Sequence, residues 1–148
     1  MNAVTVDTLA QQCAHTLFAT DACSQHLGMN IEQVNAGYAK VTMQVQPWML
    51  NGHGSIQGGM LFTFADSAFA FACNSYDQVT IGQSCTIDYL KPALLGELLQ
   101  AEAQERHRGG RTGTYDVVIT NEADEVVALF RGRSYQVKGR ILEGNNHG

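Results

Sequence analysis

The stretch that decides the fold is NGHGSIQGGMLFTFADSAFAFACNSY, residues 51–76, in which a glycine-rich turn leads into a long apolar helix. A surface helix is mostly polar with one apolar stripe, whereas this one is apolar on nearly all sides. We therefore expect other structure, most simply a sheet, to surround it. At helical spacing the exceptions fall on one narrow stripe: Thr63, Asp66, Ser67, Ala70 and Asn74.

The carboxylate of Asp66 and the glycine pair before the helix are the two chemically informative features. Gly58 and Gly59 allow close approach of a ligand, and the first N–H groups of a helix have no internal acceptors. Such donors suit the oxyanion that develops when a carbonyl is attacked. The simpler alternatives are an ordinary turn and a solvated carboxylate.

The spacing of these two features indicates a dimer. Eight residues of helix separate Gly58 from Asp66 and rise about 12 Å, too far for both to touch one reacting carbonyl. If two copies pack with these helices antiparallel about a two-fold axis, Gly58 of one lies beside Asp66 of the other. The chemistry therefore predicts two equivalent sites, each shared between subunits.

Length and composition favour one domain over residues 1–148, with 45% hydrophobic and 16% charged residues. The apolar stretch from Met60 to Cys73 is shorter than a membrane span of about 20 residues, and residues 1–12 lack a secretory pattern. We expect a cytoplasmic protein that binds no membrane. The net charge of −5 also argues against nucleic-acid binding. Four Cys and five His show no metal-ligand spacing, so neither a metal nor a cofactor is predicted.

Periodicity along the chain predicts an α+β fold. Residues 1–28 form a helical segment ending at Gly28, and the tail from 139 to 148 is expected to be flexible. Residues 29–46 alternate as a hairpin around the turn at 35–37. Four further strand patterns follow the central helix, at 79–89, 97–108, 112–120 and 126–137. A curved antiparallel sheet wrapped around one long helix accounts for all of these.

Four segments resemble the hotdog-fold acyl-CoA thioesterases, and among them the PaaI type associated with phenylacetate degradation. The segments are MLNGHGSIQGGMLFTFADSAFAFACNS (49–75), SCTIDYLKPALLGELL (84–99), GGRTGTYDVVI (109–119) and VALFRGRSY (127–135), in family order. The resemblance covers about residues 20 to 138. It implies a hotdog fold, a dimer with a continuous sheet and a dimer of dimers.

The resemblance also implies site residues. The family's catalytic carboxylate matches Asp66, its oxyanion-binding N–H matches Gly58, and its amide side chain before the glycine turn matches Asn51. Where related sequences have histidine, this chain has Gln57, which can donate a hydrogen bond to a carbonyl but cannot carry a proton. Asp66 would act as nucleophile or as general base, and both roles remain open.

The expected substrate is an acyl-CoA thioester, with coenzyme A as part of the substrate rather than a cofactor. The resemblance suggests an aromatic acyl group, phenylacetyl or hydroxyphenylacetyl. Thr63 and Ser67, on the stripe of Asp66, are candidates to position water, and Gly59 to contact the substrate. Cationic groups and backbone amides are expected to meet the phosphates of CoA. The candidates are Lys91, Arg108, Gly109, Gly110, Arg111 and Thr112.

Two other functions fit the same fold. An acyl-CoA hydratase or dehydratase would use a His/Asp pair for proton transfer, which Gln57 disfavours. A non-catalytic acyl-CoA-binding protein would tolerate Gln57 in place of histidine.

Overall fold

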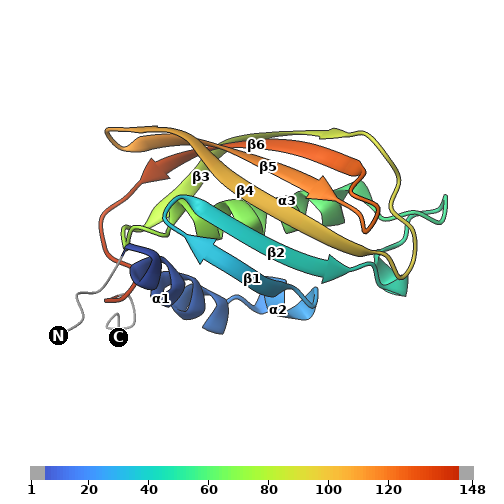
Figure 1. Ribbon diagram of the computed structural model, residues 1–148, viewed down its shortest axis with the longest axis horizontal. Helices are drawn as coiled ribbons and strands as arrows, with labels where there is room; N and C mark the ends of the chain where they lie inside the picture. The colour runs from blue at the N-terminus through green and yellow to red at the C-terminus, as the bar shows by residue number, and fades with distance from the viewer. Residues whose placement is uncertain (1–5, 144–148) are drawn as a thin grey trace.

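A six-stranded antiparallel sheet curves around helix α3 (Gly58–Cys73) in the computed structural model, which describes residues 6–143 (Figure 1). This is the predicted arrangement. The sheet order is β1-β2-β4-β5-β6-β3. The strands are β1 (Asn30–Asn35), β2 (Tyr38–Gln44), β3 (Thr80–Tyr89), β4 (Leu98–Gly109), β5 (Thr112–Thr120) and β6 (Val126–Gln136).

Alternation along the strands places one set of side chains against α3. Val41 and Met43 of β2, and Val117 and Ile119 of β5, are fully buried on this inner face. The β1–β2 hairpin is confirmed, and Gly37 in its turn adopts a φ of +71°, which glycine accommodates without steric cost. The sheet therefore supplies the apolar wall that the composition of α3 requires.

Helix α3 is held by aromatic packing on its sheet-facing sides. Phe69 is buried, and its ring centroid lies 5.6 Å from that of Tyr115 and 5.9 Å from that of Phe130. A Cβ added to Gly132 of β6 would approach this ring to 2.8 Å, so glycine permits the close contact between strand and helix. The stripe that contains Asp66 lies away from this packed face.

Asn74 belongs to the predicted stripe but has a structural role. It is buried at the end of α3, where its amide donates to the carbonyls of Ala70 (2.9 Å) and Thr80 (3.0 Å). Its oxygen accepts from the Thr80 N–H at 2.8 Å. Asn74 therefore joins the end of the helix to the start of β3 and fixes where the edge strand begins.

The N-terminal segment forms two helices, α1 (Val6–Ala19) and α2 (Ala22–His26), as predicted. Asp21 caps α2, because its carboxylate accepts from the backbone N–H of Ser24 at 2.9 Å. Gly28 follows α2 with a φ of +74°. α1 packs beside β1, which is the short edge of the sheet (Figure 1).

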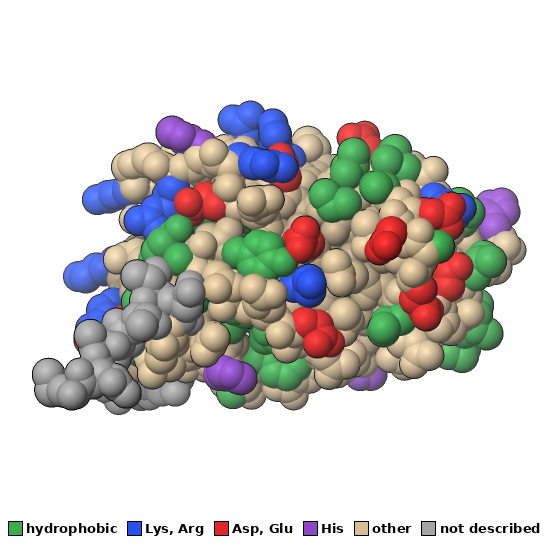
Figure 2. Space-filling model, viewed as in Figure 1, with side chains coloured by type: hydrophobic (Ala, Val, Ile, Leu, Met, Phe, Trp, Pro, Cys, Tyr) green, Lys and Arg blue, Asp and Glu red, His purple; other side chains and the backbone are tan. Residues whose placement is uncertain are grey.

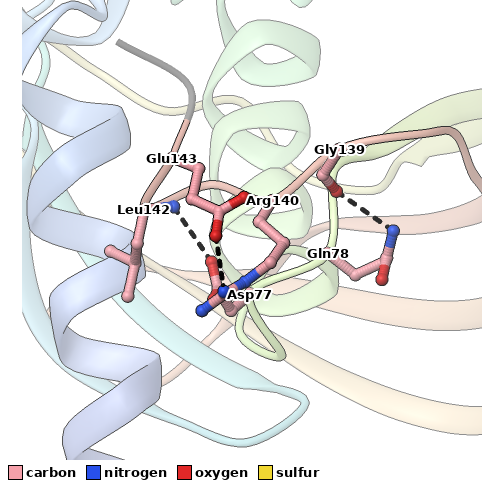
Figure 3. A network of polar contacts seen from close by, with 6 residues as sticks. All are labelled: Asp77, Gln78, Gly139, Arg140, Leu142 and Glu143. Atoms are coloured by element: carbon pink, nitrogen blue, oxygen red, sulfur yellow. Dashed lines mark hydrogen bonds and ion pairs between the residues drawn. The ribbon is translucent and has the colours of Figure 1, made fainter. Parts of the chain in front are cut away.

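The chain around residue 140 is anchored, which differs from the expected flexible tail beginning at Gly139. The buried carboxylate of Asp77 accepts from Arg140 Nε at 2.7 Å and from the Leu142 N–H at 2.9 Å (Figure 3). A buried carboxylate needs such partners, so it draws this segment onto the body of the protein. The rest of the predicted tail, residues 144–148, lies outside the described residues.

Strand β3 forms the second edge of the sheet, and this edge is open. β3 pairs only with β6 among the described residues, and Ile81 and Tyr89 at its two ends are each 51% exposed. A strand of this length with exposed apolar side chains and unpaired N–H and C=O groups favours pairing with another strand. No helix within residues 6–143 is both long and apolar enough to cross a membrane.

Candidate active site

The N-terminus of α3 presents free amide donors. Gln57 occupies the capping position, but its exposed side chain makes no capping hydrogen bond. No acceptor among the described residues lies within hydrogen-bond distance of the Gly58 or Gly59 N–H. The first turn also contains no acidic side chain. These donors, at the positive end of the helix dipole, remain available to an anionic oxygen.

Tyr89, which the sequence analysis did not single out, covers one side of this helix end. Its hydroxyl donates to the Gly58 carbonyl at 3.0 Å. A Cβ at Gly58 would lie 3.0 Å from the tyrosine ring, whereas one at Gly59 would meet nothing within 4 Å. A side chain at Gly58 would therefore press on the Tyr89 ring, and Gly59 leaves open space above the helix end. The signal in the sequence that could have identified Tyr89 is an aromatic side chain at the last position of a predicted strand.

A groove of about 340 Å³ joins three of the predicted residues, Asn51, Gly58 and Lys91. Tyr89 also lines it, whereas Asp66 does not. One chain therefore brings together the predicted oxyanion donor, the amide side chain and a cation, and the carboxylate lies elsewhere. This division agrees with the helical spacing that separates Gly58 from Asp66.

Asn51 shapes the loop that precedes the helix. Its side-chain oxygen accepts from the backbone N–H of His53 at 2.8 Å and of Ser55 at 3.3 Å. Its amide nitrogen donates weakly to the Ile56 carbonyl at 3.5 Å. Asn51 therefore holds the loop in position in the single chain, and His53 contributes a backbone donor while its side chain is exposed.

Lys91 is paired. Its Nζ lies 2.6 Å from Glu125 Oε2, and the interaction holds the pKa of Glu125 below its usual value. The ammonium group is still part of the groove wall beside Gly58, but a phosphate would have to compete with Glu125 for it.

Asp66 lies near the middle of α3, on the exposed stripe. Its side chain is exposed in the single chain, yet neighbouring protein atoms displace part of the water around it. This partial desolvation raises the pKa of the carboxyl above its usual value. The nearby carboxylate of Asp21 raises the pKa further. A carboxylate that is easier to protonate is a better base, so the surroundings of Asp66 favour proton transfer.

The hydroxyls on this stripe are already engaged within the chain. Thr63 Oγ1 donates to the Gly59 carbonyl at 2.9 Å. Ser67 Oγ lies 2.8 Å from Ser24 Oγ of α2. The sequence placed Thr63 and Ser67 beside Asp66 but gave no sign of the contact with Ser24, which is 43 residues away.

The predicted CoA-binding turn lies at the other end of α3. Arg108 stacks on the ring of Tyr76, with its guanidinium carbon 3.5 Å from the ring centroid, and Tyr76 lies three residues after the end of the helix. Gly110 has a φ of +61° in the turn between β4 and β5. Lys and Arg side chains gather mainly at this end of the molecule (Figure 2). Arg108, Gly109, Gly110, Arg111 and Thr112 are all exposed.

Other reactive side chains do not form a site. Burial raises the pKa of the Cys73 thiol to about 12, so it is protonated at neutral pH and unsuited to nucleophilic attack. All four cysteines are free. Within the described part of the chain, no cluster of three or more His, Cys, Asp or Glu side chains could hold a metal ion.

Comparisons with known proteins agree with this geometry. Residues 53–128 match the family model of the thioesterase superfamily. The chain is 48% identical over 132 residues to the acyl-coenzyme A thioesterase PaaI of Escherichia coli K12, covering 89% of this chain and 94% of that protein. The structure of E. coli PaaI, from the phenylacetic acid degradation operon, superimposes with a TM-score of 0.91 at 46% identity, over 92% of this chain and 99% of that one.

A more distant structure, smu.793 of Streptococcus mutans UA159 bound to acetyl CoA, has a TM-score of 0.73 and 27% identity, over 76% of this chain and 90% of that one. The matches to the family model and to E. coli PaaI confirm the predicted hotdog fold.

The raised pKa of Asp66 predicts how stability depends on pH. Because the folded-state pKa exceeds the usual value of about 3.9, the stability that this group contributes is present at low pH and is lost as pH rises through the folded-state pKa. Asp66→Asn removes that loss. Relative to the parent, the free energy of unfolding of the variant should therefore rise between about pH 3 and pH 6.

Asp116 provides the matched control of opposite sign. Hydrogen bonds from Arg131, and then Arg106, hold its pKa below the usual value. Asp116→Asn should therefore lose stability relative to the parent as pH rises through the lowered folded-state pKa of Asp116 to the usual value of about 3.9. Urea unfolding at fixed protein concentration measures both. A change of the same sign for the two variants would contradict this description of Asp66.

Proposed function

The chain belongs to the thioesterase superfamily, and on that basis we propose that it hydrolyses the thioester bond of acyl-CoA substrates. The observation that supports this most strongly is the pairing of free amide donors at Gly58 with the carboxylate of Asp66 on the exposed stripe of the same helix. The first group suits the oxyanion of acyl transfer, and the second suits activation of water or attack on the carbonyl. The E. coli relative is named for the same reaction class.

The proposed reaction begins with the thioester carbonyl against the Gly58 N–H and the exposed Gln57 amide. Asp66 then attacks the carbonyl carbon or removes a proton from an attacking water. Negative charge develops on the carbonyl oxygen, where the helix N-terminus stabilises it. The carbon–sulfur bond breaks and the thiolate of CoA leaves. If Asp66 acts as base, the thiolate takes the proton that Asp66 removed from water; if Asp66 attacks, water then hydrolyses the acyl–Asp66 anhydride and supplies that proton. No protein-bound cofactor is required by this chemistry.

A second copy of the chain completes the site in this proposal. The open β3 edge allows the sheets of two copies to continue into each other, with their α3 helices antiparallel. Asp66 of one subunit then faces Gly58 of the other. The family resemblance extends to a pair of such dimers, which we also propose.

The same pairing gives the β4–β5 turn a place in substrate binding. If Asp66 of the partner faces Gly58, the C-terminal end of the partner's helix extends about 12 Å beyond Gly58. The partner's Arg108, stacked on Tyr76 at that helix end, would be carried outward with it. CoA is long enough to reach from the carbonyl to such a turn, so we propose that Arg108 and Arg111 meet its phosphates.

For the acyl group we propose phenylacetyl or hydroxyphenylacetyl. Support comes from the E. coli relative, whose gene lies in a phenylacetic acid degradation operon.

We also propose a cytoplasmic location, with which four free cysteines are compatible. The groove offers no histidine for a His/Asp pair among its lining residues, which disfavours the hydratase alternative.

Replacement of the carboxylate tests the reaction directly. Asp66→Asn should keep the fold and the oligomer but lower hydrolysis of phenylacetyl-CoA by at least about two orders of magnitude, the usual effect of losing a proton-transfer group. Release of free thiol from a panel of acyl-CoAs measures it. Unchanged hydrolysis in the variant would refute the mechanism. Binding without turnover by the parent would instead identify a non-catalytic protein, and water addition to an enoyl-CoA would identify a hydratase.

The role of the β4–β5 turn is tested by removing its charges. Replacing Arg108 and Arg111 together by Gln should raise KM for phenylacetyl-CoA several-fold and leave kcat unchanged, because phosphate contacts far from the reacting carbonyl bind substrate and transition state alike. The phenylacetyl thioester of pantetheine, which lacks the nucleotide phosphates, should show no such rise. Lys40→Gln, which removes one positive charge from β2 on another part of the sheet, is the control. An equal rise in KM for both substrates would show that the β4–β5 turn does not contact the phosphates of CoA.

A further inference from the structure

A chain of hydrogen bonds connects α2 to the exposed stripe of α3. Asp21 Oδ2 accepts from Ser24 Oγ at 2.6 Å, and Ser24 Oγ lies 2.8 Å from Ser67 Oγ. Ser24 is fully buried, so its hydroxyl has no access to solvent. Ser67 is adjacent to Asp66 in the helix and is only partly buried. The contact therefore joins a surface carboxylate to a hydroxyl beside the proposed catalytic group.

The chemistry of the three groups fixes which atom donates and which accepts in each of these hydrogen bonds. A carboxylate accepts hydrogen bonds and cannot donate them, so the single proton of Ser24 points to Asp21. The contact between the two serines must then use the proton of Ser67, with Ser24 as acceptor. Ser67 consequently has no proton left to donate, and its two lone pairs can only accept.

Thr63, one turn earlier on the same stripe, is in a similar state. Its proton is given to the Gly59 carbonyl at 2.9 Å, so its oxygen also has acceptor capacity to spare. The stripe thus combines a carboxylate with two hydroxyl oxygens that accept hydrogen bonds. A surface made only of acceptors suits one small ligand with two donors, a water molecule.

We propose that Asp21, Ser24 and Ser67 form a positioning relay that makes Ser67 an acceptor for the attacking water, beside Asp66. The inference rests on the proposed thioesterase function. The water donates one hydrogen to Asp66 and the other to Ser67, which directs its oxygen lone pair at the thioester carbon. As the new C–O bond forms, Asp66 takes the first proton. The C–S bond then breaks, and this proton passes to the departing sulfur.

The same arrangement supports Asp66 as a base. The negative charge of Asp21 contributes to the raised pKa of Asp66, after the effect of burial. Asp66 and Ser67 are both close to Asp21, because the charge of Asp21 acts on Asp66 and the hydrogen bonds of Asp21 lead through Ser24 to Ser67. The proposed water lies between these two side chains. Asp21 and Ser24 touch neither substrate nor water and act through Ser67.

Two substitutions break the relay in different ways. Asp21→Asn retains a good helix cap, but the new amide can donate to Ser24 Oγ. Ser24 would then donate to Ser67, and the proton of Ser67 would point to the water site instead of to Ser24. Ser24→Ala keeps the charge of Asp21 and its bond to the backbone N–H, and removes the connecting hydroxyl. Asp124→Asn is the charge-matched control, because Asp124 has a φ of +59° in an exposed turn and asparagine tolerates that conformation.

Steady-state hydrolysis of phenylacetyl-CoA and thermal unfolding are measured for all three variants and for Asp66→Asn. We expect kcat to fall about tenfold in Asp21→Asn and Ser24→Ala, with KM unchanged, and no change in Asp124→Asn. This loss is smaller than that from removing the proton acceptor itself. Tm should stay unchanged in Asp21→Asn and fall by several degrees in Ser24→Ala, which loses a buried, hydrogen-bonded hydroxyl.

An unchanged kcat in both relay variants, with Asp66→Asn inactive, would overturn the relay and leave the proposed function intact. A fall in kcat that appears only together with a fall in Tm would overturn it too, because it would show a packing role. Full activity in Asp66→Asn would instead refute the proposed function.

Discussion

The rigidity of α3 is the constraint on which the candidate site depends. An α-helix rises 1.5 Å per residue, so the backbone positions of Gly58 and Asp66 are held about 12 Å apart along the helix axis. The groove beside Gly58 accordingly contains Asn51, Lys91 and Tyr89 but not Asp66. A single chain presents two incomplete halves, and the proposed thioesterase needs a second helix to bring them together.

The sheet determines which side of α3 stays available for that second helix. Strands from β2 to β6 cover the apolar sides, and Phe69 packs tightly enough that Gly132 of β6 leaves no room for a side chain. The polar stripe and the open β3 edge remain. The curved sheet therefore has two consequences. It buries the apolar sides of α3, and it leaves uncovered the polar stripe and the β3 edge, which are the surfaces that pair with a second copy in the proposed site.

Much of this was predictable from local patterns. Alternation placed the strands, and the apolar composition of residues 58–73 identified a surrounded helix. Contacts between distant segments were not predictable. Asn74 shares the periodicity of Asp66 but is buried as the link to β3, and periodicity cannot separate the two. The contact between Ser24 and Ser67 exists because α2 packs near the helix. The anchoring of Arg140 likewise follows from the burial of Asp77, which appears only in the folded chain.

Complementation in mixed dimers tests the shared site most directly. Asp66→Asn subunits are co-expressed with Gly58→Ala subunits, in which the added Cβ would crowd Tyr89 beside the N–H donor that the carbonyl is proposed to meet. Each variant alone should be inactive. A mixed dimer has one site with both groups intact, so isolated mixed dimers should recover about half of the parent activity. Mixed dimers that form but remain inactive would contradict the account, since they would show that each site lies within one chain.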